Sequence, residues 1–80
     1  MTDTRRRTQA ERKMAMISRL QEATITSLAE VGYARSSVAT ICKQAGVSQG
    51  ALFRHFPSRQ ALVASATTEI GRRHVKGIRE

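Results

Sequence analysis

Residues 38–56 read VATICKQAGVSQGALFRHF, two short segments with helical spacing on either side of the turn Gly46-Val47-Ser48. Gly46 can adopt the positive φ that such a turn needs, and Ser48 can cap the segment that follows. The small Cys42 leaves room where a second helix would pack closely. The apolar residues placed to hold the two helices together are Ile41, Ala45, Val47 and Leu52. This spacing predicts a helix-turn-helix.

A long helix is predicted before this motif, over about residues 9–31. Thr8 and Glu11 have the spacing of a capping box, which marks a helix start. Apolar side chains then recur at helical intervals, and they are Ile17, Leu20, Leu28 and Val31. Neither proline nor glycine interrupts the segment before Gly32, which can end the helix in a left-handed conformation.

The segments around the motif complete an all-helical pattern. Ser36 or Ser37 can cap the second helix, Val38–Ala45, and Pro57 ends the third, Gln49–Phe56. A fourth helix begins after Ser58, with inward positions predicted at Leu62, Val63, Ala66 and Ile70. No segment has the pattern of a strand. We therefore expect an all-α fold, a three-helix bundle with a helix-turn-helix plus the start of a fourth connecting helix.

The charge of the chain is unevenly distributed. The 80 residues include fourteen Lys and Arg but only six Asp and Glu, which gives a formal net charge of +8. No acidic residue lies between Glu30 and Glu69, whereas four cations do, namely Arg35, Lys43, Arg54 and Arg59. A folded segment of this composition suits phosphate or anionic lipid. Charge alone also leaves open a solvated basic face that binds nothing.

Catalytic and metal-dependent functions have no support in the sequence. There is no paired-carboxylate cluster, no glycine-rich phosphate loop and no Cys/His ligand set, so we expect no enzyme activity, catalytic residue, metal or cofactor. The single cysteine, Cys42, permits no internal disulfide, which favours a cytoplasmic protein. The longest apolar run, Met14–Ile17, is too short to span a bilayer, and no membrane partner is expected.

Most of the chain, roughly residues 12–66, resembles the N-terminal domain of the tetracycline-repressor (TetR) family. The matching residues are Gly32-Tyr33, Ser36-Ser37-Val38, Ile41, Ala45-Gly46-Val47-Ser48, Gly50-Ala51-Leu52-Phe53, His55-Phe56, Ser58-Arg59 and Leu62. The resemblance implies a transcriptional regulator whose third helix enters the major groove of a near-palindromic operator. It also implies a ligand-responsive repressor that acts as a homodimer, with a small-molecule effector bound by a C-terminal domain absent from this chain.

The resemblance also suggests a division of the chain. Residues 1–8 would form a flexible basic arm, residues 9–70 the DNA-binding domain, and residues 71–80 the end of the fourth helix or a frayed tail. The sequence departs from the family pattern at several positions. Phe53 stands where tyrosine is usual and Arg59 where lysine is usual, while Thr24 and Ser27 predict a less firmly packed first helix.

The third helix supplies the expected contacts with DNA, because Leu52 and Phe56 face inward and leave the other side exposed. The residues expected at base edges are Gln49, Gly50, Ala51 and Phe53, of which Gln49 could pair with an adenine. The residues expected at phosphates are Ser37, Ser48, Arg54, His55 and Arg59. Arg5, Arg6 and Arg7 could form an arm for the minor groove or for phosphates.

Two other functions remain open at this stage. The same helical hairpin could serve as a basic protein–protein interaction module. A basic amphipathic helix could also lie on an anionic membrane surface. That second function needs bulky aromatics on one face, and only Tyr33, Phe53 and Phe56 are present.

Overall fold

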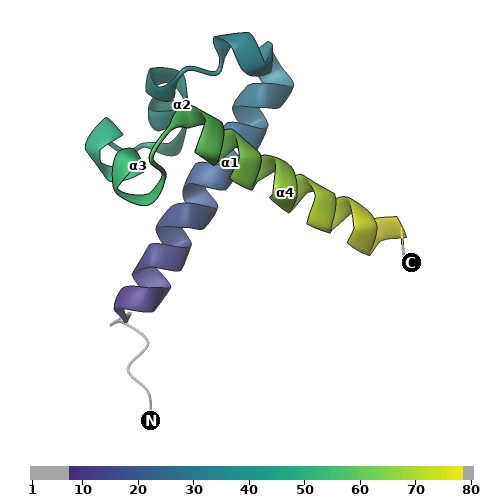
Figure 1. Cartoon of the computed structure of the whole chain (residues 1–80), viewed down its shortest axis with the longest axis horizontal. Coiled ribbons are helices and arrows are strands. Elements are labelled where there is room, and N and C mark those ends of the chain that lie inside the picture. The colour runs from purple at the N-terminus through teal and green to yellow at the C-terminus, as the bar shows by residue number, and fades with distance from the viewer. Residues whose placement is uncertain (1–7, 79–80) are drawn as a thin grey trace.

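The structure is a computed structural model that describes residues 8–78, with side chains described for residues 8–73. The elements are α1 (Gln9–Arg35), α2 (Val38–Ala45), α3 (Gln49–His55) and α4 (Arg59–Ile78). Figure 1 shows the two short helices on one side of α1, while α4 crosses α1 and extends away from them. The all-α fold with four helices, predicted from sequence, is confirmed over the described residues.

The start and the end of α1 are both set by local chemistry. Thr8 and Glu11 form the predicted capping box: the Glu11 amide donates to Thr8 Oγ1 at 3.1 Å, and the Thr8 amide donates to Glu11 Oε1 at 2.9 Å. Gly32 has a φ of 82° and breaks the helical path where the sequence predicts it. One further helical turn follows, so the element continues to Arg35.

Val31 does not lie on the buried face of α1, contrary to the sequence prediction. Its side chain is 43% exposed. The buried positions Leu20, Ala23, Thr24 and Ser27 would continue towards residue 31 at helical spacing. The core ends before residue 31, because the chain after α1 packs against the helix at Ser27. The Ser27 and Ser36 hydroxyl oxygens lie only 2.6 Å apart there.

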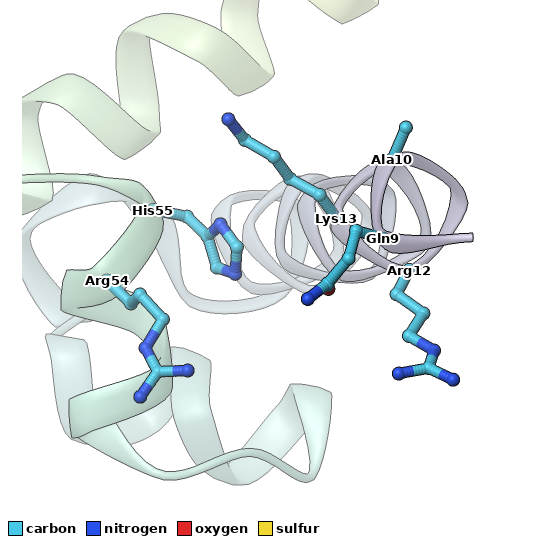
Figure 2. Close-up of a pocket in the computed structure, with 6 residues that line it drawn as sticks. All are labelled: Gln9, Ala10, Arg12, Lys13, Arg54 and His55. Atoms are coloured by element: carbon cyan, nitrogen blue, oxygen red, sulfur yellow. The ribbon is translucent and has the colours of Figure 1, made fainter. Parts of the chain in front are cut away.

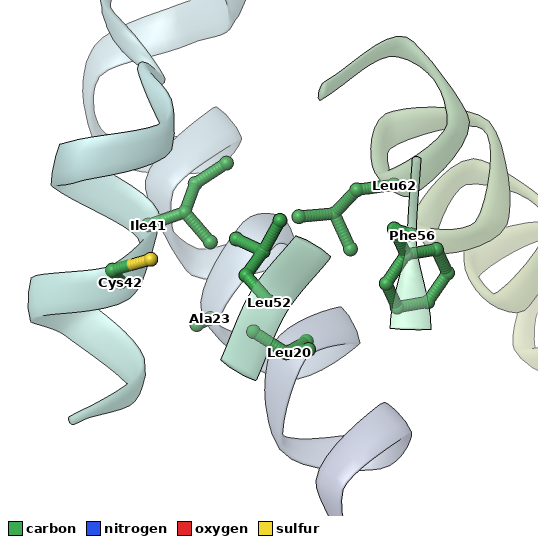
Figure 3. Close-up of a cluster of buried hydrophobic side chains, with 7 residues drawn as sticks. All are labelled: Leu20, Ala23, Ile41, Cys42, Leu52, Phe56 and Leu62. Carbon is green, nitrogen blue, oxygen red and sulfur yellow. The ribbon is translucent and has the colours of Figure 1, made fainter. Parts of the chain in front are cut away.

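The core joins all four helices around Leu52 of α3 (Figure 3). Leu52, Leu20, Ile41 and Leu62 are fully buried. The remaining members of the cluster are Ala23, Cys42 and Phe56. Removing a large aliphatic side chain from water contributes about 1.5–3 kcal/mol. Because Leu52 and Phe56 anchor α3 in this cluster, the opposite face of α3 is held in a fixed orientation.

The buried hydroxyl groups on α1 and at its C-terminal cap are all hydrogen-bonded. Thr24 is fully buried and its hydroxyl donates to the Leu20 carbonyl at 2.7 Å. Ser36 is also fully buried and donates to the Gly32 carbonyl at 2.7 Å. Since the Ser36 proton is used there, Ser27 donates to Ser36 Oγ. A buried polar group that is left without a hydrogen bond destabilises the fold, and these hydrogen bonds remove that penalty.

Pro57 determines where α3 ends and how the chain continues to α4. Phe56 has an extended backbone (φ −132°, ψ 122°), as a residue before proline favours, so α3 ends at His55, one residue earlier than predicted. The Ser58 hydroxyl accepts the Ala61 amide at 3.1 Å and caps α4 as predicted. The helix then continues through Gly71 to Ile78.

Contacts between α1 and α4 fix the crossing of the two long helices. Gln21 Nε2 donates to Ser65 Oγ at 2.7 Å, and Arg73 pairs with both Glu22 and Glu69. Ile70, predicted to face inward, is 41% exposed, because α4 diverges from α1 towards its C-terminal end (Figure 1). Among the described residues, no helix is long and apolar enough to cross a membrane.

Candidate nucleic-acid interface

The turn between α2 and α3 has the geometry predicted for a helix-turn-helix. Gly46 adopts the left-handed conformation (φ 73°, ψ 35°), and its amide donates to the Cys42 carbonyl at 2.8 Å. The Val47 amide donates to the same carbonyl at 3.0 Å. Both bonds go to the Cys42 carbonyl in the last turn of α2, and the chain changes direction within three residues. The two helices are thereby held at a fixed angle.

The side of α3 opposite the core is open to solvent. Gln49, Gly50, Phe53 and Arg54 are exposed, and Ala51 is half-buried. Phe53 is a large apolar side chain that is 45% exposed. The four residues predicted to meet base edges therefore lie together on one helix, with a rigid core behind them.

Ser37 and Ser48 occupy equivalent positions at the starts of α2 and α3. The Ser37 hydroxyl accepts the Thr40 amide and the Ser48 hydroxyl accepts the Ala51 amide, each at 3.1 Å. Ser37, and not Ser36, is therefore the cap of α2. Both serines are exposed beside helix N-termini, where backbone amides favour anions. Their predicted role as phosphate contacts stays a prediction.

Arg59 is engaged within the protein. Its Nη1 donates to the carbonyls of Tyr33 at 2.8 Å and Ser36 at 3.1 Å. Its guanidinium carbon lies 4.2 Å from the centroid of the Tyr33 ring. These contacts join the start of α4 to the connection between α1 and α2. A phosphate contact would have to use the remaining guanidinium nitrogens.

Arg54 and His55 lie across an open hollow from the first turns of α1 (Figure 2). The hollow has a volume of about 570 Å³ and its α1 wall is formed by Gln9, Ala10, Arg12 and Lys13. Sequence reasoning proposed Arg54 and His55 and did not consider the α1 residues. The only sequence signal was the pair of cations close to a helix start.

Two further observations bear on the chemistry of the interface. Among the described residues, no group of three or more His, Cys, Asp or Glu side chains could hold a metal ion. Cys42 lies in the core, and burial raises the pKa of its thiol. Arg5, Arg6 and Arg7, proposed as a DNA-contacting arm, lie outside the described residues.

Comparison with known families identifies the helix-turn-helix. Residues 20–66 match the model of the bacterial regulatory proteins of the tetR family. The chain belongs to the TetR family. The match begins at Leu20 of α1 and ends at Ala66 of α4, so it contains all the DNA contacts proposed above except those of the arm, Arg5, Arg6 and Arg7.

Curated relatives support the TetR assignment. The chain is 47% identical over 70 residues to an uncharacterized HTH-type transcriptional regulator of Mycobacterium tuberculosis, covering 88% of this chain and 36% of that protein. A Mycobacterium bovis regulator is equally similar. The regulator CymR of Pseudomonas putida is 44% identical over 59 residues, 74% of this chain and 29% of its own length. The chain thus spans about a third of these relatives. No solved structure matches it.

Proposed function

We propose that this chain is the DNA-reading part of a TetR-family transcriptional regulator and that α3 enters the major groove of double-stranded DNA. The complete regulator is a ligand-responsive repressor that binds a near-palindromic operator as a homodimer in the cytoplasm. It acts by binding and not by catalysis. In the proposed division of the chain, residues 1–8 form a basic arm, residues 9–70 the DNA-binding domain, and residues 71–80 lead towards an effector-binding and dimerisation domain.

The observation that carries the proposal is the exposed face of α3. Leu52 is fully buried and Phe56 nearly so, which fixes the helix, while Gln49, Gly50 and Phe53 face solvent. The first turn of a recognition helix reaches base edges in such motifs. No acidic residue lies between Glu30 and Glu69, so nothing in this part of the chain repels phosphate.

Each exposed residue of α3 then has a role that follows from its chemistry. Gln49 pairs with an adenine through its amide. Ala51 and Phe53 contact thymine methyl groups or sugars, and Gly50 lets the backbone approach the DNA. Ser37, Ser48, Arg54, His55 and the remaining nitrogens of Arg59 hold the phosphates that fix the register.

Selection of bound duplexes from a random library tests this proposal. Wild-type chain should enrich a short sequence, and its affinity should fall steeply with salt because phosphate contacts release counterions. Gln49→Ala should relax the preference at one base pair by about 1–3 kcal/mol. Gln44→Ala is the matched control and should leave the sequence preference unchanged. Gln44 is also an exposed glutamine, but it lines a different hollow together with residues of α1.

Two results would contradict the proposal. One is the absence of enrichment together with salt-insensitive binding, which would point to a protein partner. The other is a uniform loss of affinity in Gln49→Ala across all sequences, which would make Gln49 a backbone contact and remove it from base readout.

A further inference from the structure

We propose that the hollow between the first turns of α1 and the last turn of α3 holds a backbone phosphate of the bound duplex. The phosphate lies outside the base pairs that α3 reads. Arg12 and Lys13 of α1 thereby become DNA contacts together with Arg54 and His55. The inference rests on the proposed function and adds a second element, α1, to the interface.

The lining of the hollow is suited to an anion. Three cationic side chains and one histidine surround it, and the lining residues that the structure describes include no carboxylate. Arg12, Lys13 and Arg54 are exposed, and no ion pair within residues 8–73 engages them. Like charges gathered around one cavity repel each other, and an anion between them converts that repulsion into attraction.

Arg12 and Lys13 lie just beyond the first turn of α1. The first turn itself holds Glu11, whose carboxylate accepts the Thr8 amide in the capping box. The same end of α1 presents the amides of Gln9 and Ala10, which have no acceptor inside the helix and belong to residues that line the hollow. Cations and free backbone donors therefore lie next to each other at this end of α1, and both kinds of group can bind an external anion.

The side chains of Arg54, His55 and Arg12 border the gap between α3 and α1. Figure 2 shows His55 pointing from α3 towards α1, with Arg54 and Arg12 extending in the same direction from opposite sides of the gap. Lys13 extends on the other side of His55. A phosphodiester oxygen can accept from guanidinium, ammonium, imidazole and amide donors alike, so this mixed set fits a phosphate.

The hollow also lies where a phosphate would be. Arg54 and His55 lie at the end of α3, about 8 Å from Gln49 along the helix axis at 1.5 Å per residue. The major groove is about 12 Å wide, and the sugar–phosphate strands form its edges. With the first turn of α3 at the bases, its last turn reaches a groove edge, and α1 faces the strand there.

Salt-dependent binding of the selected duplex tests the inference. Arg12→Gln and Lys13→Gln should each lower affinity about tenfold at low salt, the typical value of one charged hydrogen bond. The loss should be equal for selected and scrambled duplexes, and the slope of log affinity against log salt should become shallower by about 1. Arg19→Gln is the matched control, an exposed arginine on α1 that faces a different hollow with Glu22, and it should behave like wild type.

A second measurement leaves the protein unaltered. Phosphates flanking the selected site are replaced one at a time by neutral methylphosphonate. Wild type should lose affinity at one outer position, and Arg12→Gln should be insensitive there. If both variants match Arg19→Gln and no flanking phosphate matters, the inference fails while the proposed function stands. If wild type does not bind duplex DNA at all, the proposed function fails, and the inference with it.

Discussion

Arg59 was expected to contact DNA, and its side chain instead makes contacts within the protein. Its two hydrogen bonds go to the carbonyls of Tyr33 and Ser36, and the Tyr33 carbonyl also accepts the Ser36 amide. Its guanidinium also stacks on the Tyr33 ring. Both hydrogen bonds come from Nη1, while the planar guanidinium can at the same time stack flat on the ring, which the ammonium of lysine cannot do. The arginine therefore fits this place better than the lysine that is usual in the family.

Arg59→Lys should reduce the free energy of unfolding by about 1 kcal/mol, the net worth of a hydrogen bond and a partly exposed cation–π contact. Urea denaturation followed by circular dichroism measures this change. Arg19→Lys is the control and should leave stability within about 0.5 kcal/mol of wild type. Arg19 is exposed, and among the described residues it makes no intramolecular hydrogen bond. Unchanged stability in Arg59→Lys, combined with weaker DNA binding, would instead make Arg59 a phosphate contact alone.

The element proposed to read DNA, α3, is only seven residues long and includes a glycine. Gly50 is not required by the fold. Its φ is not positive, and a Cβ at this position would meet only the Ser48 hydroxyl, at 3.8 Å. Glycine in a helix costs about 1 kcal/mol relative to alanine. Gly46 differs, because its φ of 73° is one that side chains rarely adopt.

Gly50→Ala should therefore stabilise the chain by up to about 1 kcal/mol and at the same time weaken DNA binding, because the added methyl holds the backbone of α3 away from the bases. Gly46→Ala is the matched control for glycine substitution and should destabilise by about 1–2 kcal/mol through backbone strain. Thermal unfolding and binding to the selected duplex measure the two effects. A Gly50→Ala variant with unchanged affinity would show that no close approach occurs at this position.

The features of these elements that could be predicted from sequence are local. The capping box at Thr8, the left-handed Gly46 and the stop at Pro57 each depend on residues no more than four apart, so the chain itself contains the necessary information. The exposed face of α3 follows similarly from the inward spacing of Leu52 and Phe56. The predicted DNA contacts on that face stay predictions.

Features that depend on tertiary packing could not be predicted from sequence. Arg59 contacts carbonyls 23 and 26 residues earlier in the chain. The hollow brings the start of α1 next to the end of α3, an approach set by how Leu52 packs between α1 and α2. Helical spacing also cannot show where a neighbouring element ends, which is why Val31 and Ile70 were assigned to the buried face and are exposed.

At the scale of the whole molecule, one copy of α3 can read very little sequence. Seven residues span about 10 Å at 1.5 Å per residue, which equals about three base pairs at 3.4 Å each. Most of the affinity of a single copy must then come from phosphates and be independent of sequence. The C-terminal end of α4 points away from α3 (Figure 1), so two copies can be joined there without covering the reading face.

Fusing a parallel coiled coil to the C-terminus through a flexible linker should therefore raise affinity for an inverted repeat of the selected site by about 100-fold or more over a single site. The gain should be largest at one half-site spacing and recur at intervals of about 10–10.5 base pairs, because both copies of α3 must face the same side of the duplex. Gel-shift titrations with half-sites at increasing separation measure this dependence, and the unfused chain on the same duplexes is the control. If the affinity of the fused protein does not vary with spacing, phosphate contacts alone hold the two copies. If the unfused chain binds one half-site tightly and selectively, a single α3 reads enough sequence by itself.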